Sequence, residues 1–435
     1  MSSRPSPDLP HVVVLGAGFA GLNFCQHLAK DRYRVTLVDR QNHHLFQPLL
    51  YQVATAGLSA PDIAQPVRSL LRHRSDITVV MDTVESIDVS ARSVTLAHGK
   101  LDYDFLFIGL GGQTSYFGND HWAEFAPGLK SLDEAVDIRR DVLSAFERAE
   151  SEPDPELRRE LMTLVVIGAG PTGVELAGTF AELTRRVLNR DFLHIDPAQA
   201  KVILIEAGPR VLPAFVEKLS TSAKHQLESL GVEVRLNSKV EDLREREVQT
   251  STGTIRAANI IWAAGVGASS LTRSLGVETD RAGRIKVEPD LSLPGHPEVF
   301  AAGDLVALKD ADGKAVPGVA PAAMQMGRYL AARFNDGPPD RTPGSAPTPP
   351  FVYRDKGNLA TIGRSAAVAQ IGALKFSGTT AWVAWLGIHL IFLVGFRNRI
   401  AVFFSWVYNY FTYKRGARII MGASKGHTGS PPGSR

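Results

Sequence analysis

Two glycine-rich loops of the same design give this sequence its most definite chemistry. The first reads Gly-Ala-Gly-Phe-Ala-Gly over residues 16–21, and the second reads Gly-Ala-Gly-Pro-Thr-Gly over residues 168–173. Each follows a short apolar run typical of a buried strand and precedes a segment that favours a helix. Glycines in that setting let the backbone approach a pyrophosphate, which then binds at a helix N-terminus. The sequence therefore predicts two dinucleotide sites. The glycines expected to form them are Gly16, Gly18, Gly21, Gly168, Gly170 and Gly173.

An acidic residue ends the next apolar strand after each loop. Asp39 follows Gly16 by 23 positions and Glu206 follows Gly168 by 38, whereas such an acid usually lies about 20 residues on. A longer helix and loop account for the second spacing, and an ordinary carboxylate at a strand end is the alternative. A carboxylate here accepts hydrogen bonds from the ribose hydroxyls of an adenosine and disfavours a 2′-phosphate. Arg210, close to Glu206, leaves some tolerance of a 2′-phosphate open.

The length and composition are those of a globular protein with several domains. The 435 residues suggest roughly three domains, and a composition 44% hydrophobic and 21% charged excludes a disordered chain. The single cysteine, Cys25, excludes an internal disulfide or a dithiol redox pair and is expected to be buried in the first helix. The N-terminal segment is polar and proline-rich, and the apolar run after it is too short for a secretion signal. We expect no transport across a membrane and no metal site.

The pattern of apolar runs predicts the same strand–helix arrangement twice, which indicates an α/β fold. The first arrangement ends in an apolar strand and glycine turn at 105–112, and the second ends in the same way at 260–265. A later strand brings Gly303 and Asp304 to a turn. The other expected segments are helices at Glu134–Arg159, about Thr172–Asn189 and Ala320–Phe334, a surface linker at 335–350 and a disordered tail from Ala423.

Charge is distributed unevenly along the chain. The net charge is +3, yet no Asp or Glu follows Asp355, while ten Lys and Arg residues do. The rest of the chain is therefore net acidic. A basic end on an acidic body indicates an anionic partner surface, which is either nucleic acid or lipid.

The residues between these cations favour lipid. Residues 381–396 read AWVAWLGIHLIFLVGF, and a second aromatic run follows Arg397 and Arg399. A spanning helix needs about 20 apolar residues, so two helices lying in the membrane interface fit better. Trp382, Trp385, Trp406 and Tyr410 are expected at headgroup depth. A membrane span and a buried or dimer-forming helix pair remain alternatives to the interfacial helices. Nucleic acid is a weaker candidate than lipid for the anionic partner.

These motifs together resemble the type II NADH:quinone oxidoreductases, the alternative, non-proton-pumping family. The likeness covers roughly residues 10–420. The glycine loops are shared by many reductases, whereas the segment at 42–54 and the C-terminal aromatic and basic stretch are more specific. The matching pieces are VVVLGAGFAG at 12–21, NHHLFQPLLYQVA at 42–54, GPTGVELAG at 170–178, AAGD at 301–304, and Trp385 and His389 followed by GFRNR at 395–399.

The resemblance decides which dinucleotide each loop would bind. It assigns the first loop and Asp39 to FAD, and the second loop and Glu206 to NADH. The FAD site would also include Gly303, Asp304 and Ala320, and the NADH site would include Ala264 and Gly265. A turn-capping role is the alternative for Asp304.

On the quinone side, the resemblance singles out Glu175 and Gln325 as catalytic. Glu175 lies early in the second helix, where a carboxylate that only favours the helix dipole is the alternative. Gln325 matches the second glutamine of the family's A-Q-x-x-x-Q element, but Pro321 stands where the first is expected. His43 and His44 are expected to pack in the core or against the flavin.

The implied function is FAD-dependent transfer of two electrons from NADH to a membrane quinone without proton pumping. The alternatives are a soluble-type NAD(P)H reductase of another acceptor and a membrane-docked NADH-sensing flavoprotein with little turnover. A sulfide:quinone reductase or a thioredoxin-type reductase would need catalytic cysteines that this sequence lacks. The expected location is peripheral, on the cytoplasmic face of the inner or plasma membrane, and a homodimer is left open.

The expected fold is two Rossmann-like dinucleotide-binding domains, as in two-dinucleotide flavoproteins, plus a C-terminal membrane-anchoring helical module. The predicted divisions are 10–155 and 285–345 for the two parts of the FAD domain, 156–284 for the NADH domain, 346–422 for the C-terminal module and 423–435 for the tail.

Overall fold

The chain folds into two compact units, each built from three separate segments. A computed structural model describes residues 8–189, 191–310, 313–339, 349–412 and 417–420. The first unit is Met1–Leu45, Ala64–Gln113 and Val266–Lys356, and the second is Phe46–Ile63, Thr114–Gly265 and Gly357–Arg435.

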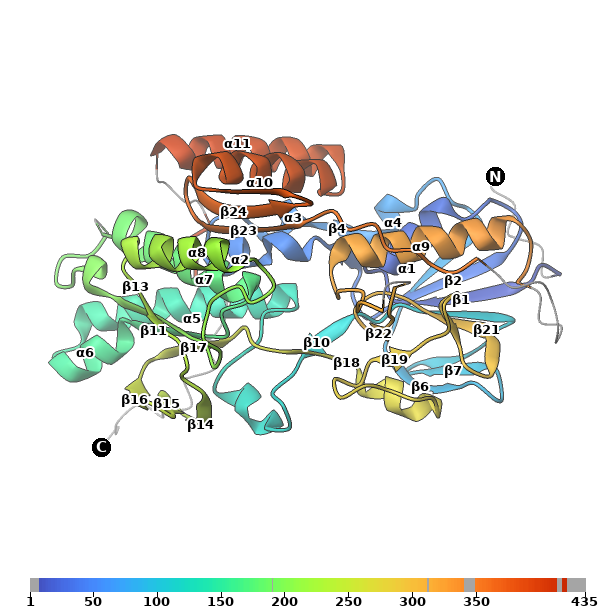
Figure 1. Cartoon of the computed structure of the whole chain (residues 1–435), viewed down its shortest axis with the longest axis horizontal. Helices are drawn as coiled ribbons and strands as arrows, with labels where there is room; N and C mark the ends of the chain where they lie inside the picture. The colour runs from blue at the N-terminus through green and yellow to red at the C-terminus, as the bar shows by residue number, and fades with distance from the viewer. Residues whose placement is uncertain (1–7, 190, 311–312, 340–348, 413–416, 421–435) are drawn as a thin grey trace, which may run out of the picture. The chain divides into compact units, whose positions relative to one another are not determined.

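The first unit is centred on a six-stranded sheet with the order β20-β21-β9-β1-β2-β5 (Figure 1). All neighbouring pairs are parallel except β20 with β21. The central strand is fully buried, as expected for an apolar parallel strand covered on both faces. The bounds are β1 His11–Leu15, β2 Arg34–Asp39, β5 Ile77–Met81, β9 Phe105–Ile108, β20 Ser292–Leu293 and β21 His296–Ala301.

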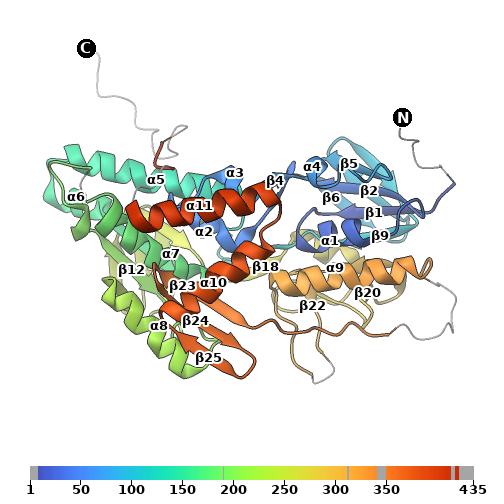
Figure 2. The ribbon, with the colours of Figure 1, turned by 90° about the horizontal axis from the view of Figure 1, so that it is seen from above.

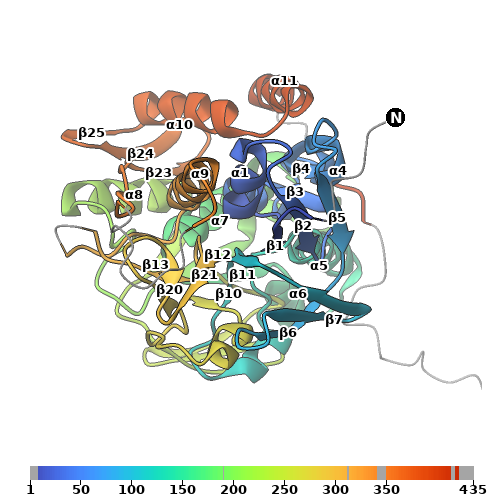
Figure 3. The same cartoon turned by 90° about the vertical axis from the view of Figure 1, so that its right-hand side faces the viewer.

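Two helices, α1 (Phe19–His27) and α9 (Ala320–Asn335), pack side by side in this unit (Figure 3). Gly327 allows the close crossing, because a Cβ there would lie 2.2 Å from the Ala20 carbonyl oxygen. The bounds of α9 confirm the helix expected at 320–334. The smaller elements are β3 His43–Leu45, β4 Ala64–Pro66, α4 Val67–Leu70, β6 Val84–Asp88, β7 Ser93–Leu96, β8 Gly99–Asp102, β19 Ile285–Lys286 and β22 Val306–Ala307.

The second unit repeats the design with a four-stranded parallel sheet of order β13-β12-β11-β17. Its glycine loop joins β11 to α7, as the first loop joins β1 to α1. The predicted α/β fold with two nucleotide-binding arrangements is therefore confirmed. The bounds are β11 Thr163–Ile167, α7 Pro171–Glu182, β12 Lys201–Ile205, α8 Glu217–Ser229, β13 Val232–Arg235, β14 Val240–Arg244, β15 Glu247–Thr250, β16 Gly253–Arg256 and β17 Asn259–Trp262.

The second unit is completed by the short helices α2 and α3, the helices α5 and α6, and the C-terminal strands and helices. The C-terminal strands and helices pack on the same unit, with β23 against α7 and α10 against β24 (Figure 2). The remaining bounds are α2 Leu50–Ala54, α3 Ala60–Ile63, α5 Leu132–Ser151, α6 Pro155–Leu161, β23 Asn358–Gly363, β24 Ala366–Ile371, β25 Leu374–Ser377, α10 Thr379–Phe392 and α11 Phe396–Thr412, with β10 Gly112–Thr114 and β18 Val266–Ala268 pairing where the chain passes between the units.

Two predicted helices differ from the observed ones for local reasons. The single helix expected at 134–159 is two helices, because α5 ends at Ser151 and Asp154 caps a new helix with Pro155 in its first turn. The helix expected at 172–189 begins at Pro171 and changes to a π-helical turn at Leu183–Val187.

The compact units are a division by contacts, and the predicted domain bounds stay a prediction. The chain passes from one unit to the other after residues 45, 63, 113, 265 and 356. Helix α5 packs on α2 and β17, which places it in the second unit, while Leu275 is buried in the core of the first. Most of the predicted linker, at 340–348, and the predicted tail lie outside the described residues.

Candidate functional site

The first glycine loop has the geometry of a phosphate cradle. Gly16 has a φ of +98°, and a Cβ on it would lie 2.3 Å from the Gly109 carbonyl oxygen. Above Gly18 there is open space, with nothing within 4 Å of a Cβ built there. Helix α1 begins after Gly18 without a side-chain cap. Its first N–H groups can therefore be satisfied by an anion, which fits the predicted pyrophosphate.

The second loop repeats these features. Gly168 has a φ of +99°, and Gly170 precedes α7 with no side-chain cap and open space above it. A Cβ built on Gly168 would lie 2.7 Å from the Cβ of Ala264 and would collide with it. Gly265, the neighbouring predicted residue, has a φ of +81° and lies against Phe117. Ala264 is thus adjacent to the loop, with Gly265 next to it in the chain, while the role of both residues in binding stays a prediction.

Each strand-end carboxylate is bound to its own loop. The Ala17 N–H donates to Asp39 Oδ2 at 2.6 Å, and the Ala169 N–H donates to Glu206 Oε2 at 2.8 Å. A second backbone N–H donates to the other oxygen of each carboxylate at 2.8 Å. These bonds fix both acids at the edge of the cradle, where the ribose of a dinucleotide would lie.

Asp304 lies in the first unit with space left around its carboxylate. Gly303 before it has a φ of +90°. A Cβ built on Gly112 would lie 3.5 Å from Asp304 Oδ2, and a Cβ built on Gly318 would lie 3.6 Å from Asp304 Oδ1. Because Gly112 and Gly318 carry no side chains, neither fills the space beside this carboxylate, which leaves room for ligand hydroxyls. The residues present therefore fit the FAD contact that the resemblance implies.

The first two turns of α9 hold the other residues predicted in the first unit. Ala320 starts the helix without a side-chain cap, and Pro321 fits its first turn. The Gln325 amide pairs with the backbone of Arg354, donating to its carbonyl oxygen and accepting from its N–H, both at 3.0 Å. This pairing already uses one donor and one acceptor of the amide. The predicted quinone role of Gln325 stays a prediction.

His44 is buried in the first unit beside the FAD loop. Its Nδ1 pairs with the Ala17 carbonyl oxygen at 2.8 Å, and its ring meets Phe19 edge to face. Burial lowers the pKa of His44, so the neutral imidazole is favoured. Its Nε2 is buried and, among the described residues, has no hydrogen-bond partner.

Glu175 is buried on α7, between the second loop and the C-terminal strands. Its Oε1 accepts a hydrogen bond from the Thr361 N–H at 3.4 Å. Burial raises the pKa of Glu175 to about 8, although the Thr361 N–H and the Trp385 indole each lower it. Glu175 is therefore a carboxylic acid that holds its proton at neutral pH, which suits a proton donor or acceptor.

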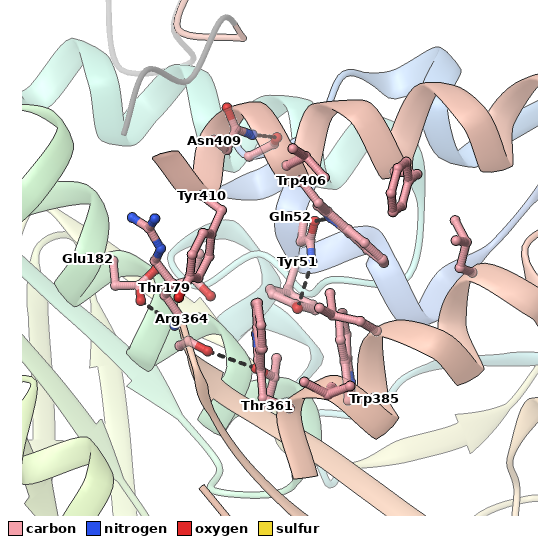
Figure 4. A pocket seen from close by; sticks show the side chains of 18 of the residues that line it. Tyr51, Gln52, Thr179, Glu182, Thr361, Arg364, Trp385, Trp406, Asn409 and Tyr410 are labelled. Atoms are coloured by element: carbon pink, nitrogen blue, oxygen red, sulfur yellow. Dashed lines mark hydrogen bonds between the residues drawn. The ribbon is translucent and has the colours of Figure 1, made fainter. Parts of the chain in front are cut away.

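A cavity of about 640 Å³ lies next to Glu175 within the second unit (Figure 4). Its walls come from α2, α7, β23, α10 and α11, so residues from four separate parts of the chain surround one space. Apolar and aromatic side chains make up most of the wall. The residues labelled in Figure 4 are Tyr51, Gln52, Thr179, Glu182, Thr361, Arg364, Trp385, Trp406, Asn409 and Tyr410.

Polar contacts hold the helices around this cavity. Trp406 Nε1 donates to Gln52 Oε1 at 2.8 Å, and Asn409 Nδ2 donates to the Gly57 carbonyl oxygen at 3.1 Å. These bonds tie α11 to α2 and to the segment after it. At the other side, the Arg364 N–H donates to Glu182, and the Arg364 guanidinium lies 4.1 Å from the centre of the Tyr410 ring. The cavity is thus apolar with a charged rim.

Comparison with known proteins identifies the family to which this chain belongs. Residues 10–327 match the pyridine nucleotide-disulphide oxidoreductase family, and residues 356–414 match the NDH2 C-terminal domain. The chain is 45% identical to the type II NADH:quinone oxidoreductase Ndh of Mycobacterium tuberculosis, over 94% of this chain and 90% of that protein. The chain belongs to the type II NADH:quinone oxidoreductase family.

More distant proteins are also similar to this chain, one in sequence and one in fold. The type II NADH:quinone oxidoreductase of Staphylococcus haemolyticus is 28% identical over 86% of this chain and 92% of that protein. The structure of NDH2 from Plasmodium falciparum in complex with NADH has the same fold, with a TM-score of 0.85 and 21% identity over 95% of this chain and 100% of that chain.

The C-terminal helices of this family member expose a broad apolar surface. None of the helices in the described part of the chain is long and apolar enough to cross a membrane. The exposed residues of this surface, which we call the apolar face, are Val383, Ile391, Phe392, Ile400, Phe403, Phe404, Val407, Tyr408 and Phe411.

The expectation that the tryptophans lie at an exposed interface is wrong for Trp385. Trp385 is only 1% exposed and stacks on His389, with ring centres 4.1 Å apart. Trp406 turns toward Gln52. The exposed positions of these helices carry phenylalanine, valine, isoleucine and tyrosine side chains, whereas these two indole rings have polar or aromatic partners inside the unit.

Sequence reasoning missed several residues of the cavity. Tyr51 and Gln52 lie in the segment quoted for the family resemblance, yet no role was inferred for them. Thr361 contributes a backbone N–H, for which the sequence carries no signal. Glu182 and Arg364 become neighbours only because β23 packs against α7.

The raised pKa of Glu175 predicts a pH-dependent loss of stability. The unfolded carboxyl ionises near 4.5, whereas the folded one stays protonated up to about 8. Stability from the neutral form is therefore complete below 4.5 and is lost as the pH rises toward 8. The Glu175→Gln variant lacks this loss. Its melting temperature should exceed that of the wild type by a margin that grows between these pH values and then levels off. A margin that is the same at every pH would contradict the assigned pKa.

Proposed function

We propose that this protein oxidises NADH with a bound FAD and passes two electrons to a membrane quinone. The observation that carries the proposal is the position of α7, together with membership of the family. The N-terminus of α7 starts at the second glycine loop, and the same helix carries Glu175 and lines the apolar cavity with Thr179 and Glu182. One rigid helix thereby links a dinucleotide cradle to a space suited to an apolar substrate.

In this proposal the first unit holds FAD and the second holds NADH. The first loop and Asp39 bind the FAD pyrophosphate and adenosine, with Asp304 and the start of α9 on the flavin side. The second loop and Glu206 bind NADH, with Ala264 and Gly265 beside the nicotinamide. The flavin, when bound, supplies the hydride and electron chemistry. The protein contributes orientation, exclusion of water and a proton at Glu175.

The cavity is the proposed entry for the quinone. Its aromatic wall suits an uncharged ring and an isoprenoid tail. Quinone reduction consumes two protons, and the neutral Glu175 carboxyl holds one beside the wall. Gln325 remains a proposed contact to the quinone on the grounds of the family resemblance.

A membrane-docked NADH-sensing flavoprotein and a soluble-type reductase are the rival functions. Both would bind NADH and flavin, but neither has a use for an apolar cavity beside a buried acid. Turnover with a quinone separates all three.

The decisive experiment follows the absorbance of the purified flavoprotein without oxygen. Adding NADH should bleach the flavin, and adding a short-chain quinone should restore the oxidised spectrum in repeated cycles. A flavin that bleaches but is not restored by quinone would contradict the proposed acceptor. A protein that holds no flavin would contradict the whole assignment.

The Glu206 carboxylate predicts a preference for NADH over NADPH. It occupies the ribose edge of the second cradle and repels a 2′-phosphate. The Glu206→Gln variant should narrow the ratio of kcat/KM for the two donors by roughly 10-fold, equivalent to about 1.4 kcal/mol. Its effect should appear mainly as improved use of NADPH.

Asp39 offers the matched control, since it holds the same position in the first unit. Asp39→Asn should weaken FAD retention and leave the donor ratio of the flavin-loaded fraction unchanged. Equal wild-type kcat/KM values for the two donors would show that Glu206 does not select the donor.

We also propose that the apolar face rests on the cytoplasmic surface of the membrane. A homodimer stays a prediction. The nearby cations Arg397 and Arg399 fit an anionic headgroup layer. The double variant Phe404→Ser/Phe411→Ser should reduce co-flotation with anionic vesicles, because these side chains are 63% and 76% exposed. NADH-dependent flavin bleaching should remain.

The control for this membrane test is Leu193→Ser, at a side chain 92% exposed outside the apolar face. It should float as the wild type does. Undiminished flotation of the double variant would show that the apolar face does not hold the protein on lipid.

A further inference from the structure

Phe117 is an exposed member of an aromatic cluster in the second unit. The Trp262 ring packs against Tyr116, Phe117 and Trp122, with ring centres 5.2, 6.2 and 5.6 Å away. Trp262 also donates its indole N–H to the Ser115 carbonyl oxygen at 2.9 Å, which fixes the segment. Tyr116, Trp122 and Trp262 are buried, whereas Phe117 is 69% exposed. The core of the unit therefore leaves most of the Phe117 ring uncovered.

The backbone at this position also disfavours a phenylalanine. Phe117 and Gly118 have φ angles of +53° and +94°, and the Asn119 N–H closes the turn by donating to the Tyr116 carbonyl oxygen at 3.1 Å. Two successive positive φ angles are typical of a type I′ turn, whose first central position favours Asn, Asp or Gly. A bulky side chain there is strained, and such strain is found mostly at functional sites. Neither the turn nor the core explains a phenylalanine at this position.

The exposed ring lies at the end of the strand that borders the second glycine loop. A Cβ built on Gly265 would lie 2.6 Å from Cζ of Phe117 and 3.1 Å from its Cε2, so the edge of the ring rests on bare backbone. Ala264, the preceding residue, lies against Gly168, the first glycine of the loop. Phe117 is therefore separated from the predicted NADH cradle only by the end of β17.

The strand order shows which half of a dinucleotide would come near this ring. The parallel sheet has the order β13-β12-β11-β17, and ligands of such sheets bind beyond the carboxyl ends of the strands. Glu206, the predicted ribose contact, follows β12, the glycine loop follows β11, and Gly265 lies after β17. A dinucleotide with its adenosine at Glu206 and its pyrophosphate on the loop therefore extends its other half over the end of β17. In NADH that half carries the nicotinamide.

We propose that the Phe117 ring packs against the nicotinamide half of bound NADH and shields it from water. The inference rests on the proposed function, since it takes the second cradle as the NADH site. A planar aromatic side chain stacks well on another flat ring, and the bound ligand would cover the surface that the core leaves open. The ring carries no proton or charge to transfer. Phe117 is therefore a binding residue that takes no part in hydride transfer.

The test compares two ligands that differ in the nicotinamide half, using the oxidised, flavin-loaded protein. The tetrahydronicotinamide analogue of NADH keeps the whole dinucleotide but cannot donate a hydride, whereas ADP-ribose lacks the nicotinamide. Phe117→Asn should weaken binding of the analogue by roughly 3- to 10-fold, the scale of one aromatic contact. The Kd of ADP-ribose should stay unchanged. Isothermal titration calorimetry measures both constants.

The melting temperature separates a binding role from a structural one. Asn tolerates a positive φ better than Phe does, so the ligand-free melting temperature of Phe117→Asn should not fall. Phe117→Tyr keeps the ring and should bind both ligands as the wild type does. The matched control is Leu193→Asn, which removes an exposed apolar side chain of the same unit, on the loop beyond the C-terminal end of α7. It should change neither Kd.

Unchanged binding of the analogue to Phe117→Asn would overturn the inference. Equal weakening of both ligands would also overturn it, and a lower melting temperature alongside would assign the ring to the fold. If Phe117→Asn does not fold, Phe117→Gly meets the same backbone requirement, and the same selective loss is required of it. Failure of the proposed function is distinguishable, because it would appear as wild-type protein that binds neither ligand or whose flavin quinone does not restore.

Discussion

A strand-end carboxylate bound back to a glycine loop is the interaction on which both units depend. In each unit the carboxylate accepts the N–H just after the first glycine, at 2.6 Å for Asp39 and 2.8 Å for Glu206. This bond joins the ends of two neighbouring parallel strands, at the edge where the sequence predicts a dinucleotide. No side chain caps the start of α1 or α7, so the first N–H groups of both helices stay available to a ligand. The same interaction therefore positions both predicted cradles.

Helix α7 runs from the second predicted cradle to the cavity. Its N-terminus follows the second loop, and it packs against β23 and α2. Gly178 lets β23 approach closely, since a Cβ there would lie 2.0 Å from the Ile362 carbonyl oxygen. Close packing of this kind places the Thr361 N–H over Glu175 and removes the carboxyl from water. A buried acid that accepts the Thr361 N–H is the consequence, and it lies beside the aromatic wall without being part of it.

The C-terminal helices contribute to both the cavity and the apolar face. Trp406 and Trp385 have partners inside the unit, in Gln52 and His389. Phe403 and Phe411 belong to the apolar face and also line the cavity. A short helix pair thereby closes the cavity and presents an exposed apolar surface. This arrangement also means that removing the whole segment would expose Glu175, so single exposed residues test membrane contact more cleanly.

The sequence by itself determined the two cradles, because their glycines, strands and acids are local in the chain and follow from backbone geometry. It also determined the family, through the segment at 42–54 and the C-terminal stretch. Only the tertiary structure decided what surrounds Glu175. Tyr51, Thr361, Trp385 and Trp406 come from distant segments, and which ring faces inward depends on packing between elements. Burial, and with it the raised pKa of Glu175, is a property of that packing and has no local signal in the sequence.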